Sequence, residues 1–100
     1  MKISKTLDGK DLTVSLEGYL DTTSSPELKQ ALDETMDSID SLTFDFADLE
    51  YVSSAGLRIL LTANNAMAKK GGMKIIHVNE EIMDSLTVTG LADVLNVEKA

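Results

Sequence analysis

Residues 42–72 read LTFDFADLEYVSSAGLRILLTANNAMAKKGG, and two periodicities follow one another in this stretch. Apolar and polar residues alternate over 42–47, which is the period-two pattern of a strand with one buried face. Over 54–70 the apolar residues recur every three or four positions, which indicates an amphipathic helix that a Gly-Gly pair ends. The stretch therefore predicts a strand followed by a helix. The expected core positions of this helix are Leu57, Leu60, Leu61, Asn64, Met67 and Ala68.

The residues before this stretch predict a hairpin and a further helix. Alternating segments at 3–7 and 11–17 flank an Asp-Gly turn, as in a pair of antiparallel strands. Ser24, or the serine after it, can then cap a helix over 26–38, because Ser24-x-x-Glu27 fits the capping box. A hairpin followed by a helix thus leads into the central strand.

The residues after the stretch add a strand at 73–78, a helix at 80–89 and a last short strand at 94–97. The resulting order is ββαβαβαβ, and strands that alternate with helices indicate an α/β fold. We expect a mixed, mainly parallel sheet of four or five strands covered by helices. A chain of 100 residues has the size of one domain, so we predict a single domain over 1–100. The expected apolar positions of the third helix are Ile82, Met83, Leu86 and Val88.

The composition narrows the classes of partner. The formal net charge of −8 and the pI of about 4.4 oppose binding to nucleic acid and to anionic membrane surfaces. The same charge favours a partner with a basic docking patch, although many acidic proteins use their charge only for solubility. The chain has no cysteine, which excludes disulfides and thiolate metal sites. The N-terminus lacks the apolar run of a signal peptide, so we expect a cytoplasmic protein.

The residues that could support catalysis are few. His77 is the single histidine, and the G-x-S-x-G pattern around Ser54 lacks its first glycine, which disfavours a serine hydrolase. Asp45, Asp48 and Glu50 could suggest a magnesium site. However, Asp45 alternates with two phenylalanines and should face solvent on its strand. We therefore predict no enzymatic activity, no metal and no cofactor.

Two hydroxyls, those of Ser53 and Ser54, precede the long helix. One interpretation is simple capping of the helix, which is worth about 1 kcal/mol. The other is that one serine accepts a phosphate, which adds about −1.5 to −2 charges. The free N–H groups and the dipole of a helix N-terminus would accommodate that charge without unfolding the domain. The residue pattern alone leaves both interpretations open.

Three segments in order make the chain similar to the STAS domain family, in its bacterial anti-sigma factor antagonist (anti-anti-sigma factor) form. GYLD at 18–21 resembles the G-x-L-D of the family, and DFADL at 45–49 resembles its central strand and strand exit. VSSAGL at 52–57 resembles D-S-[ST]-G-L and is the most specific of the three. The resemblance covers nearly the whole chain and implies a STAS-like fold.

The resemblance also implies a phosphorylation switch at Ser54. In the family, an anti-sigma factor that is a serine kinase phosphorylates this position. The unphosphorylated antagonist binds that kinase, which frees the sigma factor, and a serine phosphatase resets the cycle. Ser53 stands where the family usually has aspartate, so Ser53 remains an alternative acceptor. Arg58 stands where a small residue is common, and it could pair with the phosphate or with a carboxylate of the partner.

The expected docking surface lies at the start and along the outward side of the long helix. Ile59 belongs either to this surface or to the periphery of the core. The alternative function is a STAS module that serves as an interaction or regulatory subunit in a pathway without a sigma factor, such as secretion, two-component signalling or lipid transport. The residues predicted to contact the partner are Asp21, Ser53, Ser54, Ala55, Gly56, Arg58, Ile59 and Thr62.

Overall fold

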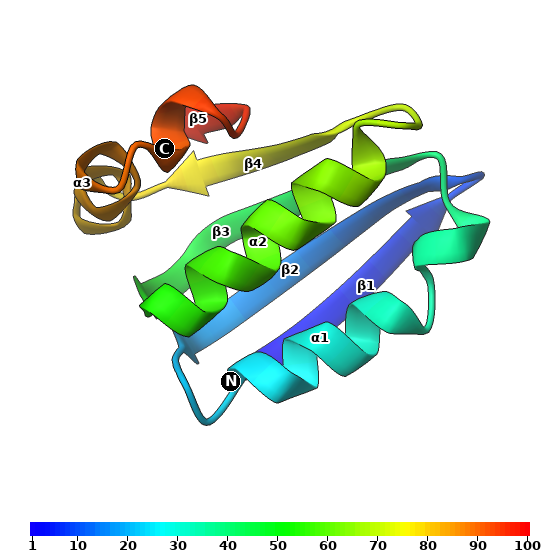
Figure 1. The fold of residues 1–100 in the computed structure, drawn as a ribbon. Helices are drawn as coiled ribbons and strands as arrows, with labels where there is room; N and C mark the ends of the chain where they lie inside the picture. Colours follow the sequence, from blue (N-terminus) through cyan, green and yellow to red (C-terminus); the bar gives the residue numbers. More distant parts are fainter.

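A five-stranded sheet in the order β1-β2-β3-β4-β5 organises the computed structural model, which describes residues 1–100 (Figure 1). β1 and β2 pair antiparallel, and β2, β3, β4 and β5 pair parallel. The predicted α/β class and mixed, mainly parallel sheet are therefore confirmed. The strands are β1 (Lys2–Asp8), β2 (Asp11–Leu20), β3 (Ser41–Val52), β4 (Met73–Val78) and β5 (Val97–Lys99). The helices are α1 (Ser25–Asp33), α2 (Ser54–Met67) and α3 (Glu80–Val88), with short 3-10 turns η1 (Met36–Ser38) and η2 (Leu91–Asp93).

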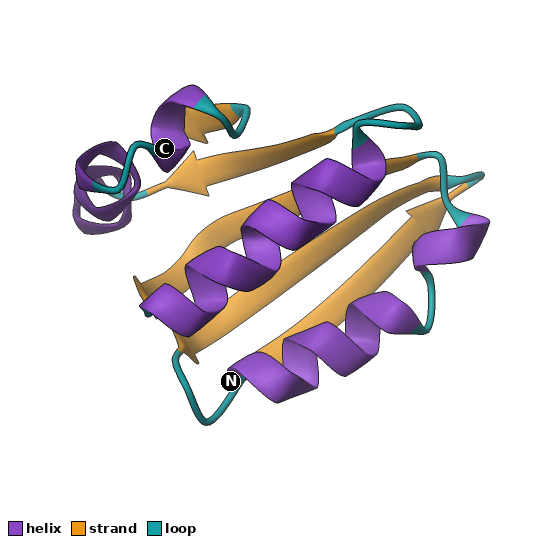
Figure 2. Ribbon diagram, in the orientation of Figure 1, coloured by secondary structure: helices purple, strands orange, loops and turns teal.

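The main core lies between the sheet and two helices. Figure 2 shows α1 and α2 side by side across one face of the strands, while α3 lies at the far edge, beyond the end of β4. Phe44 and Phe46 of β3 are fully buried among 22 core residues, together with Leu60 and Met67 of α2. On β3 the intervening Thr43 and Asp45 are only half-buried, as the alternation predicts. No helix is both long and apolar enough to cross a membrane.

The hairpin confirms the sequence prediction. Asp8 and Asp11 are the last paired residues before the turn, and Gly9 takes a φ of 64° there. A positive φ of this size favours glycine because it has no Cβ. Every second residue over this part of β2 is buried and faces the helices, namely Leu12, Val14 and Leu16.

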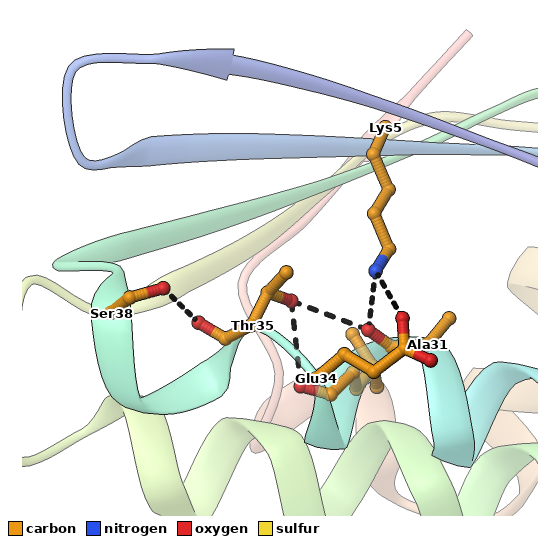
Figure 3. Close-up of polar contacts among 6 residues, drawn as sticks. Lys5, Ala31, Glu34, Thr35 and Ser38 are labelled. Atoms are coloured by element: carbon orange, nitrogen blue, oxygen red, sulfur yellow. Dashed lines mark hydrogen bonds and ion pairs between the residues drawn. The ribbon is translucent and has the colours of Figure 1, made fainter.

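The first helix begins next to its predicted N-cap, Ser24, but its side-chain capping and its C-terminal end differ from the prediction. Ser24 occupies the N-cap position, but its hydroxyl donates to the Tyr19 carbonyl oxygen at 2.7 Å instead of capping, so the capping box does not form. The helix ends at Asp33, and η1 replaces its expected last turn. Figure 3 shows one reason: the Lys5 ammonium of β1 lies 2.6 Å from the carbonyl oxygen of Ala31, where a helix C-terminus favours a cation. Lys5 also lies 3.6 Å from a carboxylate oxygen of Glu34.

The central strand and the second helix also have different limits. β3 runs through to Val52 instead of ending near residue 47, because β2 pairs with it along that length despite two register shifts. α2 ends at Met67 instead of Lys70, whose ammonium reaches back to the carbonyl oxygens of Met36 and Ile39 at 2.6 and 2.9 Å. The expected core position Ala68 is exposed, whereas Ala63 is buried in its place. Leu61 and Asn64 are only half-buried.

The C-terminal segment corrects two further predictions. Val88 is 87% exposed and does not join the core, because it lies at the end of α3, just before Gly90 turns the chain with a φ of 80°. The last strand covers Val97–Lys99 instead of residues 94–97, because η2 and buried Leu95 occupy the preceding positions.

Candidate functional site

The candidate site lies where β2 and β3 end beside each other. Leu20 and Val52 are paired in register at these ends, and the Ser53 N–H donates to the Leu20 carbonyl oxygen at 2.8 Å. The chain then enters α2 after β3 and the loop toward α1 after β2. The topology therefore places Asp21 and the two serines at the same end of the sheet.

The two serines have different roles in the structure. Ser53 is the N-cap of α2, and its hydroxyl accepts the Gly56 N–H at 3.2 Å. Ser54 is the first residue of the helix, its side chain is exposed, and its hydroxyl makes no hydrogen bond within the chain. The capping role and the free hydroxyl thus belong to different residues.

Gly56 allows the helix to start close to the strand ends. A Cβ on Gly56 would lie 2.7 Å from Leu20 Cγ, 2.9 Å from Leu20 Cδ2 and 3.1 Å from Val52 Cγ1. Such distances are too short for any side chain without movement of its neighbours. Gly56 was predicted to contact a partner, and the structure buries it against the core side of the strands. This packing role was missed at the sequence level.

Asp21 organises the loop that leads into α1. Its Oδ1 accepts hydrogen bonds from the backbone N–H groups of Ser24 at 2.9 Å and Thr23 at 3.0 Å, and from the Ser24 hydroxyl at 3.1 Å. These bonds, the Ser24 N–H foremost, hold the pKa of Asp21 below its ordinary value. The carboxylate therefore stays ionised beside the strand ends, and part of the role of Asp21 is local.

The remaining residues predicted to contact a partner lie within the first three turns of α2. Arg58 and Thr62 are exposed, and the Thr62 hydroxyl donates to the Arg58 carbonyl oxygen at 3.0 Å. Ala55 is half-buried. Ile59 is half-buried as well and packs against the edge of the core, while also lining a hollow between α1 and α2. Both interpretations of Ile59 therefore describe part of its surroundings.

His77 and Asp45 form a separate pair. His77 Nδ1 lies 2.8 Å from Asp45 Oδ1, and His77 has a φ of 59°, a left-handed conformation rare outside glycine. Partial burial would raise the pKa of Asp45, but the hydrogen bonds with His77 and the Ala47 N–H outweigh it and lower the pKa below its ordinary value. The histidine is thus paired with Asp45 and not with Ser54, so the arrangement of a serine hydrolase does not form.

No three carboxylate or imidazole side chains come together as a metal site would require. Asp45, Asp48 and Glu50 therefore do not converge on one point. The polar groups that the structure does gather lie at the ends of β2 and β3.

Comparisons with known proteins identify the family of the chain. The family model described as "Mlab, STAS domain" matches residues 3–97. The chain belongs to the STAS domain family. This STAS domain is 26% identical over 88 residues to the anti-sigma-B factor antagonist of Bacillus subtilis (strain 168), which covers 87% of the chain and 81% of that protein.

Solved structures show the same fold. An anti-sigma factor antagonist from Mycobacterium paratuberculosis superposes on the STAS domain with a TM-score of 0.89, at 23% identity, over 99% of this chain and 86% of that one. The Bacillus cell fate determinant SpoIIAA in its phosphorylated form gives a TM-score of 0.76, at 12% identity, over 96% and 90%. The resemblance noted in the sequence is thereby confirmed for the family and for its fold.

Proposed function

We propose that this STAS domain is an anti-sigma factor antagonist switched by phosphorylation of Ser54. With a free Ser54 hydroxyl it binds an anti-sigma factor that is a serine kinase, and the sigma factor is released. Phosphorylation of Ser54 ends the interaction, and a serine phosphatase restores it. The observation that carries the proposal is the exposed hydroxyl of Ser54, which is free of hydrogen bonds at the first residue of α2.

The surroundings of Ser54 suit a phosphate that acts on a partner and not on the fold. A helix N-terminus offers backbone N–H groups and a positive dipole end to an anion. Ser53 already caps Gly56, so a phosphate on Ser54 displaces no existing side-chain bond. The added charge of about −1.5 to −2 would instead change the surface that the partner meets. The names of the similar proteins, including a phosphorylated one, support the same assignment.

Phosphate transfer tests the acceptor directly. The protein is mixed with ATP and an anti-sigma factor serine kinase from the same organism, and intact mass spectrometry counts the phosphates. We expect one phosphate on the wild type and on Ser53→Ala, and none on Ser54→Ala. Transfer to Ser54→Ala but not to Ser53→Ala would move the acceptor to Ser53. A wild type that takes no phosphate from this kinase would count against the proposal.

Binding tests the switch. Ser54→Asp places a negative charge at a helix N-terminus, where it is tolerated. We expect it to weaken kinase binding at least tenfold in calorimetry while the urea midpoint stays within error of the wild type. Ser54→Asn is the matched uncharged control and should bind within about threefold of the wild type.

A second candidate function is an interaction subunit in a pathway without a sigma factor. The matching family model carries the description Mlab and mentions no sigma factor, and Ser53 departs from the aspartate usual in the antagonists. Affinity capture from the native cell separates the two candidates. Recovery of a serine kinase supports the antagonist, whereas recovery of secretion, two-component or lipid-transport proteins supports the alternative.

A further inference from the structure

A hollow of about 310 Å³ lies between α1 and α2, on the side of α2 that continues from Ser54. Leu32 lines it from α1, and Ile59, Ala63 and Ala66 line it from α2. The two helices start at the same end of the sheet and run side by side (Figure 1), and the hollow lies between the later part of α1 and the middle of α2. Its volume is sufficient for one large side chain.

Small side chains on α2 create the hollow. Ala63 is buried at its floor and Ala66 is exposed at its rim, so neither fills the space between the helices. An apolar recess of this kind is costly to leave in contact with water, and its burial is a source of binding free energy.

Two cationic side chains lie at the edge of the hollow, and only one of them forms an ion pair. Lys29 lies 2.9 Å from Asp33 one turn along α1, so its charge is already compensated. Arg58 on α2 is the only arginine of the chain, and it forms no ion pair although 17 acidic residues are present. An unpaired guanidinium therefore lies beside an apolar recess on a molecule with a net charge of −8.

We propose that this hollow receives a helix of the kinase that phosphorylates Ser54. That helix inserts one large aliphatic or aromatic side chain between α1 and α2, and presents a carboxylate about one turn away to Arg58. The inference rests on the proposed function, and it names the chemistry of the contact.

Two observations select this occupant. Arg58 lies one helical turn after Ser54 on α2, so a protein whose active site reaches Ser54 also covers the near end of the hollow. Charge complementarity then favours an acidic group on the partner, because Arg58 is exposed at the edge of the hollow and forms no ion pair within the chain. Amphipathic helices commonly bind by laying an apolar anchor into a groove between helices.

The first test fills the hollow. Ala66→Phe places a ring at the rim without moving a buried group, and we expect kinase affinity to fall at least tenfold. Ala68→Phe is the matched control, because Ala68 is exposed directly after the last residue of α2 and does not line the hollow, and it should bind within about twofold of the wild type. Circular dichroism melting of both variants shows whether each is folded. Equal affinity of folded Ala66→Phe and the wild type would overturn the proposal.

The second test removes the guanidinium. Arg58→Gln should weaken kinase binding at least fivefold, whereas Lys69→Gln, which removes one cation elsewhere on the exposed surface, should change it less than twofold. Both positions are exposed, so the comparison does not depend on refolding of the core. Equal effects of the two variants would show a general charge effect and would also overturn the proposal.

The outcomes separate this proposal from the function on which it rests. If Ser54 accepts a phosphate and Ala66→Phe binds the kinase as the wild type does, the antagonist function is supported and the hollow is not part of the interface. If Ala66→Phe binds the kinase more weakly but no serine accepts a phosphate, the hollow is supported as a binding surface and the phosphorylation switch is contradicted. A wild type that does not bind the kinase, or that forms a dimer which Ala66→Phe dissociates, contradicts the proposed occupant.

Discussion

Gly56 shows how one residue positions the start of α2. The ideal Cβ of an alanine there would lie 2.7 Å from Leu20 Cγ and 3.1 Å from Val52 Cγ1. Alanine gains up to about 1 kcal/mol over glycine in a helix. Overpacking of this kind costs about 1–3 kcal/mol, which exceeds that gain, so we expect Gly56→Ala to lower the free energy of unfolding in urea by up to about 2 kcal/mol.

Asn65→Ala is the control for Gly56→Ala. Asn65 is exposed on α2, so its substitution changes helix propensity without a clash. It should leave the free energy of unfolding unchanged or slightly higher. If Gly56→Ala were equally harmless, α2 would have room to move away from the strands.

Asp45 and His77 allow a prediction about pH. The pKa of Asp45 is lowered in the folded protein, so its contribution to stability is present above about pH 4 and is lost as pH falls through the folded pKa. His77→Ala removes the hydrogen bond at 2.8 Å and should raise the pKa of Asp45 toward its ordinary value. NMR titration of the side-chain carboxyl carbon measures this, with Asp21 as the internal control that should not change. If the pKa of Asp45 were the same in His77→Ala as in the wild type, groups other than His77 would be responsible for its lowered value.

The N-terminus of α2 separates a structural hydroxyl from a free one. Ser53→Ala removes the bond to the Gly56 N–H and should lower the free energy of unfolding by about 1 kcal/mol. Ser54→Ala removes a hydroxyl without partners and should change it by less than about 0.5 kcal/mol. Chemical denaturation of the two variants side by side measures the difference. Equal losses would mean that Ser54 also caps the helix.

The order of elements follows from the sequence because periodicity reports which face of each strand or helix is buried. β3 and α2 are the clearest cases, since alternation and helical spacing follow one another directly. The limits of α1 did not follow, because they depend on groups distant in the chain. The Lys5 ammonium reaches the carbonyl oxygen of Ala31 from a strand 26 residues away. The Ser24 hydroxyl prefers the Tyr19 carbonyl oxygen to the helix N-terminus, and no local pattern records this preference.

The candidate site was predictable only in part for the same reason. The order of Ser53 and Ser54 marked the end of a strand and the start of a helix, but only the geometry assigns the cap to Ser53. The hollow combines Leu32 of α1 with Ile59 of α2, and their approach depends on how both helices pack on the sheet. A motif search along one helix cannot find such a surface.

The charge of the whole molecule is poorly compensated. The chain carries 17 acidic and 9 basic residues, and only Lys5–Glu34 and Lys29–Asp33 pair a lysine with a carboxylate. Both pairs have exposed members and contribute little to stability. Self-repulsion among the remaining carboxylates therefore opposes the compact state.

Salt should relieve this repulsion. Raising sodium chloride shortens the Debye length from about 30 Å at 0.01 M to about 8 Å at 0.15 M, which screens the exposed carboxylates from one another. We expect the urea midpoint at pH 7 to rise over this interval. Near pH 4.4 the net charge approaches zero, and the same step should change the midpoint much less, because attraction and repulsion are then screened alike. Asp21 and Asp45 remain largely ionised at that pH, since their pKa values are lowered, so their local bonds persist in the comparison. An equal rise at both pH values would show that salt acts through burial of apolar surface and not through the net charge of −8.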